Sequence, residues 1–296
     1  MKTSITGIFA PIITPFSEDE TVAYDKLEYN LRKWVEQGLD GIVMPGSNSE
    51  SVFLRREERL QIWQVCADVL EGTSARFLAG TGMESTAETV ELTQVAGEMG
   101  AQATLLLPPF FYKSQMTYDV LLTHFRSVAD ASPIPILVYN VPVFTGLDLA
   151  LSTLEALAEH PNIIGVKDSS SNVVKMASLQ ALCPDFLIFS GTGSSLLPFL
   201  SLGAVGGILA LANFAAVPLR HLMDAFLAGR LEEARAIQLS LTHINSAVTT
   251  RFGVPGLKYA MDQTGFCGGI PRRPLLPVSA GIREEIDRLL AGLKLE

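Results

Sequence analysis

Basic residues are scarce in this chain of 296 residues, which has 22 Lys and Arg against 31 Asp and Glu and a net charge of −9. That balance argues against a nucleic-acid-binding surface, which needs clustered Lys and Arg. It leaves a small anionic substrate open, because such a ligand meets only its own pocket. Cysteine is also rare, with three residues far apart in the chain. They suggest no disulfide framework, so a reducing, cytoplasmic setting is expected.

Long apolar runs and metal-binding clusters are missing as well. No stretch approaches the roughly 20 apolar residues that cross a bilayer, and the N-terminal residues lack the pattern of an export or organelle signal. We therefore expect no membrane association. The four histidines stand in segments of helical pattern, without the spacing of a metal site. Carbon–carbon chemistry would then need a lysine as its electron sink.

Eight short apolar runs alternate with segments of helical spacing, at intervals of about 20 to 35 residues. This pattern predicts a (β/α)8 TIM barrel over residues 1–230, with an open, doubly wound sheet as the alternative. Three more helical segments, at 231–248, 255–262 and 282–293, predict a C-terminal helical extension over 231–296 that packs on the barrel. The eight predicted strands are 7–13, 39–44, 75–79, 103–107, 134–139, 163–167, 186–190 and 205–209.

Lys167 ends the apolar run 162–167. The run has β-branched residues, a glycine and no polar alternation, which is typical of a buried parallel strand. A lysine at the mouth of such a strand loses part of its hydration, which disfavours its charged form. A neutral amine in a closed pocket attacks a ketone carbonyl, so Lys167 is a candidate Schiff-base nucleophile. The alternative is a lysine that leaves the barrel rim and extends its amine into water.

Tyr139 ends the preceding apolar run, 134–139. It is the sixth residue of that run, as Lys167 is of 162–167, so the two are expected to lie close together on neighbouring strands. A phenol at this place can relay protons during carbinolamine formation and carbon–carbon cleavage. The alternative is a core tyrosine whose hydroxyl is satisfied by hydrogen bonding.

Other strand ends have hydroxyl, amide and glycine residues. The second strand is followed by Pro-Gly-Ser-Asn-Ser-Glu at 45–50, where backbone N–H groups at a helix entrance suit a carboxylate or phosphate. Ordinary helix capping by Asn48 or Ser49 is the alternative for those residues. Segments 80–82 and 190–195 are rich in glycine, but neither has the spacing of a dinucleotide-binding motif or a P-loop. Tight turns account for them.

Several segments together resemble a known family. They are Pro-Ile-Ile-Thr-Pro-Phe at 11–16, Gly-Ser-Asn-Ser-Glu at 46–50, Tyr-Asn-Val-Pro-Val-Phe-Thr-Gly at 139–146 and Gly-Val-Lys-Asp-Ser at 165–169. These motifs resemble those of the pyruvate-dependent class I aldolases of the dihydrodipicolinate synthase / N-acetylneuraminate lyase family. Within it, the chain is most similar to 4-hydroxy-2-oxoglutarate aldolases, in segments 46–48, 202–207, 210–213 and 251–258.

The resemblance implies an enzyme that needs no metal or organic cofactor, because the substrate itself becomes a lysine imine. In that reading Lys167 forms the imine with a small 2-oxo acid, Tyr139 shuttles the proton with Ser47 beside it, and Ser47 and Asn48 hold the pyruvyl carboxylate. Family members commonly assemble as a homotetramer, a dimer of dimers, so the resemblance implies the same assembly here. The apolar loop 108–112 suits a subunit contact. The further substrate-binding positions are Ser169, Gly191, Ile208, Phe144 and Tyr112.

Three positions depart from the family pattern. Dihydrodipicolinate synthases have an Arg two residues after the Pro of Tyr-Asn-Val-Pro, where this chain has Phe144. They also use a Tyr from the adjacent subunit, where this chain has Phe111, with Tyr112 next to it. Ser49 replaces a Gly of the 46–50 loop and so removes a residue free to adopt positive φ. The first two differences disfavour dihydrodipicolinate synthesis.

The expected reaction is reversible retro-aldol cleavage of a 4-hydroxy-2-oxo acid. The leading substrate is 4-hydroxy-2-oxoglutarate, which gives pyruvate and an aldehyde such as glyoxylate. Two enzymatic alternatives are a 4-hydroxy-tetrahydrodipicolinate (dihydrodipicolinate) synthase and a 2-oxo-3-deoxy sugar acid aldolase or dehydratase. A barrel that binds 2-oxo acids as a sensor, without turnover, is the non-enzymatic alternative.

Overall fold

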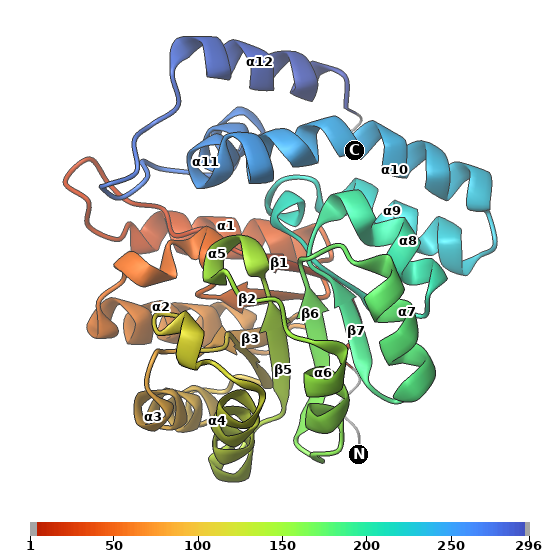
Figure 1. Ribbon diagram of the computed structural model, residues 1–296. Coiled ribbons are helices and arrows are strands. Elements are labelled where there is room, and N and C mark those ends of the chain that lie inside the picture. Colours follow the sequence, from red (N-terminus) through yellow and green to blue (C-terminus); the bar gives the residue numbers. More distant parts are fainter. Residues whose placement is uncertain (1–4, 294–296) are drawn as a thin grey trace.

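A computed structural model describes residues 5–293 as a closed barrel of eight parallel strands surrounded by helices (Figure 1). The strands pair in chain order, and β1 closes the barrel against β8. Each strand lies within a predicted apolar run or ends one residue beyond it, which confirms the predicted (β/α)8 barrel. The strands are β1 Gly7–Pro11, β2 Gly41–Met44, β3 Arg76–Gly80, β4 Ala103–Leu106, β5 Ile136–Asn140, β6 Ile163–Asp168, β7 Leu187–Ser190 and β8 Gly206–Ile208.

The outer helices begin where polar caps and helical spacing indicate. Ser85, for example, accepts a hydrogen bond from the N–H of Glu88 and so caps α3, and Asn172 caps α7 in the same way through Lys175. Their apolar sides pack on the barrel. The helices are α1 Tyr24–Glu36, α2 Arg56–Leu70, α3 Thr86–Glu98, α4 Tyr118–Ala131, α5 Pro142–Thr145, α6 Leu151–Ala158, α7 Val173–Leu182, α8 Leu196–Ser201 and α9 Ala216–Leu227.

Short helical turns follow several strands at their carboxyl ends. Three matter for the site: η1 Ser47–Ser49 after β2, η4 Gly193–Ser195 after β7 and η5 Ala210–Asn213 after β8. In a parallel barrel these strand ends all open on the same side of the molecule. The barrel interior beneath them is apolar and includes Tyr139 and Ile208.

The C-terminal helices pack on this same side. They are α10 Leu231–Ser246, α11 Gly253–Gln263 and α12 Ala280–Ala291, with a π-helical turn, η6 Ala247–Arg251, between the first two. They form the blue layer at one end of Figure 1, where α10 contacts η4, and α11 and η6 contact η5. The ends of the two predicted domains, residues 1–4 and 294–296, lie outside the described residues. Within 5–293, no helix has both the length and the apolar character that a bilayer crossing requires.

A buried histidine on α4 predicts an acid-sensitive stability. His124 Nδ1 lies 2.9 Å from Thr86 Oγ1, and burial lowers the pKa of His124 from 6.5 to about 4. Between those values the unfolded chain binds the proton and the folded chain does not, so the free energy of unfolding falls as the pH falls. At pH 5 the loss from this group is about 2 kcal/mol relative to pH 7.

The measurement is urea unfolding of wild type and His124→Gln at both pH values. The variant is expected to lose about 2 kcal/mol less than wild type on going from pH 7 to pH 5. His243→Gln, at an exposed position of α10, is the matched control and should follow wild type. Parallel pH profiles of wild type and His124→Gln would contradict the assignment.

Candidate active site

Lys167 and Tyr139 face each other on adjacent strands. The register of β5 and β6 pairs Tyr139 with Lys167 directly, as their matching places in the two runs predict. Their side chains are buried, with exposed fractions of 4% for Tyr139 and 2% for Lys167. Lys167 Nζ lies 4.0 Å from the centroid of the Tyr139 ring. The amine is therefore inside the barrel mouth beside the phenol and does not extend into water.

No carboxylate in residues 5–293 forms an ion pair with Lys167. The nearest in sequence, Asp168, faces the other side of the strand, because successive side chains alternate. It accepts hydrogen bonds from Asn140 Nδ2 at 2.6 Å and from Ser170 Oγ at 2.8 Å, and Lys175 Nζ lies 4.0 Å away. Burial raises the pKa of Asp168, although the hydrogen bonds from Asn140 and Ser170 oppose that shift. The lysine amine is thus left without a counter-charge.

The loop after β2 brings a hydroxyl to the phenol. Ser47 begins η1, and its Oγ lies 3.3 Å from Tyr139 Oη. Ser49 accepts the N–H of Gly46 at 2.8 Å and donates its own hydroxyl to the carbonyl of Ile12. The positive φ in this loop is at Glu50, at 56°, so serine at position 49 does not strain the backbone.

The remaining predicted pocket residues lie at neighbouring strand ends. Ser169 Oγ donates to the carbonyl of Gly191 at 3.4 Å, and a Cβ at position 191 would meet that Oγ at 2.0 Å, so only glycine fits there. Ile208 is buried in the same interior cluster as Tyr139. Asn48 is half-buried, and its Nδ2 approaches the carbonyl of Pro11 at 3.5 Å.

Phe144, Phe111 and Tyr112 lie on the surface of the single chain. Their exposed fractions are 59%, 73% and 69%, and the last two pack edge to face with ring centroids 5.1 Å apart. The structure therefore does not bring Phe144 and Tyr112 together with Lys167 in the barrel mouth. These rings present an apolar surface near the carboxyl ends of β4 and β5.

Two cavities differ in their relation to this site. The smaller is lined by Tyr139, Gly46 and Arg59 among others. Arg59 is buried, and burial lowers its pKa to about 10. Sequence patterns missed Arg59, because an arginine in an amphipathic helix normally faces water.

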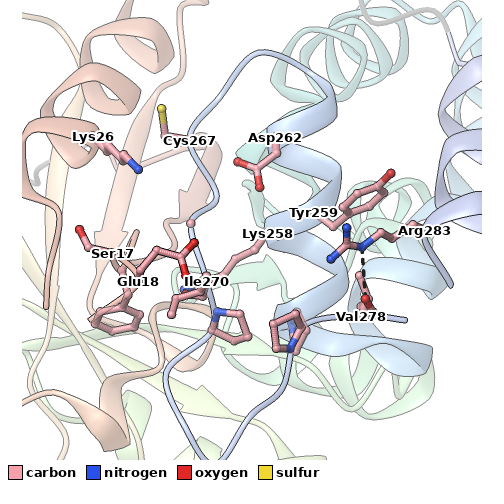
Figure 2. Close-up of a pocket in the computed structure, with 15 residues that line it drawn as sticks. Ser17, Glu18, Lys26, Lys258, Tyr259, Asp262, Cys267, Ile270, Val278 and Arg283 are labelled. Carbon is pink, nitrogen blue, oxygen red and sulfur yellow. Dashed lines mark hydrogen bonds between the residues drawn. The ribbon is translucent and has the colours of Figure 1, made fainter. Parts of the chain in front are cut away.

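The larger cavity, of about 500 Å³, lies under the C-terminal extension and includes neither Lys167 nor Tyr139 among its lining residues (Figure 2).

A parallel barrel that holds a buried lysine beside a tyrosine at the carboxyl ends of its strands, with no ion pair to that lysine among residues 5–293, has the arrangement of a barrel enzyme. Among residues 5–293, no cluster of three or more His, Cys, Asp and Glu side chains could hold a metal ion. The model of the "Dihydrodipicolinate synthetase family" matches residues 4–293. The chain belongs to this family of pyruvate-dependent lyases.

Individual relatives cover nearly the whole chain. A 4-hydroxy-tetrahydrodipicolinate synthase of Synechococcus elongatus is 35% identical over 290 residues, which are 97% of this chain and 96% of the relative. A probable mitochondrial 4-hydroxy-2-oxoglutarate aldolase of Emericella nidulans is 37% identical over 281 residues, which are 93% of this chain and 91% of the relative.

Solved structures agree with the fold. Dihydrodipicolinate synthase of Acinetobacter baumannii, crystallised with pyruvate, superposes with a TM-score of 0.92 at 30% identity over 98% of this chain and 99% of that one. The 4-hydroxy-tetrahydrodipicolinate synthase of Methylacidiphilum fumariolicum has the same TM-score, 0.92, at 31% identity over 97% and 95% of the two chains. These similarities establish the family, while the two differently named relatives leave the substrate open.

The contact between the two hydroxyls predicts unequal effects of removing them. Tyr139→Phe should keep the fold but lower turnover by about 10²- to 10⁴-fold, because a positioned proton-transfer group is lost. Ser47→Ala should cost about tenfold or less, because it removes one neutral hydrogen bond. Steady-state kinetics and circular dichroism check both variants. Tyr118→Phe, at an exposed tyrosine of α4, is the matched control, and near-normal turnover of Tyr139→Phe would remove Tyr139 from the relay.

Proposed function

We propose that this chain is a Schiff-base-forming class I aldolase that cleaves a 4-hydroxy-2-oxo acid, foremost 4-hydroxy-2-oxoglutarate, to pyruvate and an aldehyde such as glyoxylate. The observation that carries this proposal is the buried amine of Lys167, which lies beside the Tyr139 ring and has no ion-pair partner in the described part of the chain. No carboxylate among residues 5–293 occupies this amine, so it is free to approach a carbonyl carbon. Such an amine can attack the 2-oxo carbon of the substrate.

The proposed reaction proceeds in balanced steps. Lys167 Nζ adds to C2, and the carbinolamine loses water to give a protonated imine. In that loss of water the Tyr139 phenol, with Ser47 next to it, gives its proton to the departing hydroxyl group, and the resulting phenolate accepts the proton of the 4-hydroxyl group. The C3–C4 bond breaks, and its electron pair moves into the imine to form an enamine while the aldehyde leaves. Protonation at C3 and hydrolysis then release pyruvate and the free lysine, so the reaction requires no metal or organic cofactor.

The β2 loop is proposed to hold the carboxylate next to the reacting carbonyl. Ser47 and Asn48 open η1, so their N–H groups have no acceptor within that helical turn. Backbone N–H groups of this kind suit an anion. Ser169, Gly191 and Ile208 are proposed to line the pocket, and glycine at 191 leaves room where a side chain would collide with Ser169.

The leaving aldehyde sets the substrate, and of the two departures at Phe144 and Phe111, the one at Phe144 concerns the partner of a substrate carboxylate. Phe144 stands where dihydrodipicolinate synthases have an arginine for the second substrate's carboxylate. An uncharged ring at this place cannot pair with that carboxylate. Dihydrodipicolinate synthesis remains the second candidate, because the full-length relative from Synechococcus elongatus has that name. A 2-oxo-3-deoxy sugar acid aldolase or dehydratase is the third.

Assembly as a homotetramer is part of the same proposal. Phe111 and Tyr112 expose most of their rings in the single chain, and exposed aromatic surface of this kind favours a contact with another subunit. Either ring could then approach the active site of a neighbouring copy.

Reduction with borohydride in the presence of pyruvate tests the imine directly. We expect loss of activity and a reduced pyruvyl adduct on the peptide that contains Lys167, because only an imine at that amine is trapped. Peptide mass mapping checks the position. Lys258, which is equally buried but ion-paired, serves as the internal control and should stay unmodified. An unmodified Lys167, or an adduct elsewhere, would contradict the mechanism.

A substrate panel tests the aldehyde partner. Pyruvate release from 4-hydroxy-2-oxoglutarate should exceed condensation of pyruvate with aspartate semialdehyde by about ten- to hundredfold in kcat/KM, because the latter lacks its charged partner at position 144. Phe144→Arg should narrow that gap. Fast condensation by wild type would identify a dihydrodipicolinate synthase, and water loss from a sugar acid without aldehyde release would identify a dehydratase.

A further inference from the structure

Glu50 stands directly behind the proposed carboxylate loop in an unusual conformation. It ends η1 and precedes η2 Ser51–Phe53, with φ 56° and ψ 40°, in the left-handed region. Residues other than glycine hold this conformation only where their surroundings fix it. The N–H of Glu50 donates to the carbonyl of Ser47 at 3.2 Å. A change in the backbone at Glu50 therefore moves Ser47 directly.

The side chain of Glu50 is held by the C-terminal extension. Its Oε1 lies 2.6 Å from Lys258 Nζ of α11, in an ion pair rather than an aligned hydrogen bond, and each side chain is 1% exposed. Its Oε2 accepts the backbone N–H of Arg272 at 2.8 Å. Breaking one side of a buried pair leaves the other charge uncompensated, so neither group can leave alone.

Lys258 is itself fixed in place. Its Nζ donates to the carbonyl of Ile270 at 2.6 Å and lies 4.5 Å from the centroid of the Phe16 ring. Figure 2 shows the side chain running from its helix toward Ile270. Burial lowers the pKa of Lys258 to about 8, although the neighbouring Glu50 opposes that shift. The amine therefore has a full set of partners and is not free to act on a substrate.

The loop is held from the barrel side as well. Thr14 Oγ1, just after β1, donates to the carbonyl of Ser49 at 2.7 Å. Arg272 also reaches the next turn, where its guanidinium donates to the carbonyl of Phe53 at 2.8 Å and to Glu58 at 2.7 Å. The turn around residues 47–50 thus lies between the end of β1 and the C-terminal extension.

We propose that Lys258 is a positioning residue of the active site, because its buried ion pair with Glu50 sets the conformation of the loop that presents Ser47 and Asn48. This inference rests on the proposed role of that loop in binding the substrate carboxylate. Lys258 acts through Glu50 and touches no reacting atom. Without the pair, Glu50 leaves the left-handed conformation, and Ser47 loses its place beside Tyr139.

The chain offers a control for a merely structural role. Lys33 of α1 also joins the C-terminal extension to the barrel, since its Nζ donates to the carbonyl of Gly265 at 2.6 Å and lies 4.4 Å from the centroid of the Phe266 ring. Its partners lie between Lys258 and Arg272 in the chain but are different residues from those that hold Glu50. Lys33→Met should therefore weaken the attachment of the extension without moving the loop.

The experiment compares Lys258→Met, Glu50→Gln and Lys33→Met with wild type, well below the unfolding temperature of each. Hydrogen–deuterium exchange of residues 45–54 reads the loop without any ligand. Exchange there should be at least tenfold faster in Lys258→Met and Glu50→Gln, and unchanged in Lys33→Met. The pyruvate concentration for half-maximal borohydride trapping at Lys167 should rise at least tenfold in the first two variants only, with a smaller change in kcat.

Two further variants keep the test decisive. Lys258→Arg retains the charge and should restore most of the pyruvate affinity, and Glu50→Gln carries the test if Lys258→Met does not fold. The double variant Glu50→Gln/Lys258→Met leaves no uncompensated charge, so it should be more thermally stable than either single variant. Its pyruvate concentration for half-maximal trapping should nevertheless stay above that of wild type. The inference would be overturned if Lys258→Met and Glu50→Gln matched Lys33→Met both in the hydrogen–deuterium exchange of residues 45–54 and in the pyruvate concentration for half-maximal trapping. If Lys258→Met and Glu50→Gln speed loop exchange but wild type shows no trapping at Lys167, the proposed function is rejected, and what stands is only that the Glu50–Lys258 pair fixes the conformation of the loop.

Discussion

The hydrogen-bond register between β5 and β6 is the constraint on which the candidate site depends. It pairs Tyr139 with Lys167, so both side chains project into the same interior of the barrel. A shift of one residue would turn Lys167 to the helix side and bring Asp168 inward. Because the sheet is closed, with β1 paired to β8, no strand can slip without disturbing every neighbour. The whole barrel thus fixes one amine beside one phenol.

The parts of the site that the strands do not fix belong to loops, and those loops are held by distant parts of the chain. The turn at 47–50 contacts the end of β1 on one side and α11 on the other. The loops after β7 and β8 contact α10 and α11. The C-terminal extension therefore completes the carboxyl face of the barrel, where loops alone would be mobile. That arrangement explains why an extension with no proposed catalytic group is continuous with a catalytic barrel.

Features of the fold and site that depend on local sequence patterns were predicted, whereas features that depend on contacts between residues far apart in the chain were missed. Strand limits and the facing of Tyr139 and Lys167 followed from apolar runs of matching length. The pairing of Glu50 with Lys258 joins residues in separate predicted domains, and no local pattern indicates such a contact. The positive φ was expected to concern position 49, whereas the structure has it at Glu50, because buried partners there hold a conformation that propensity disfavours. Arg59 was missed because burial of an arginine depends on what covers it.

Lys167 and Lys258 are both buried, but their different surroundings suit them to different roles. Lys258 has a carboxylate 2.6 Å away and a carbonyl acceptor, and these partners oppose the burial that lowers its pKa to about 8. Lys167 has an aromatic ring beside it and no ion pair within the described chain. The carboxylate that follows it, Asp168, is turned away and engaged by Asn140 and Ser170. A carboxylate paired with Lys167 would occupy the amine that is proposed to add to the 2-oxo carbon, whereas the carboxylate of Glu50 joins Lys258 to the loop that it is proposed to position.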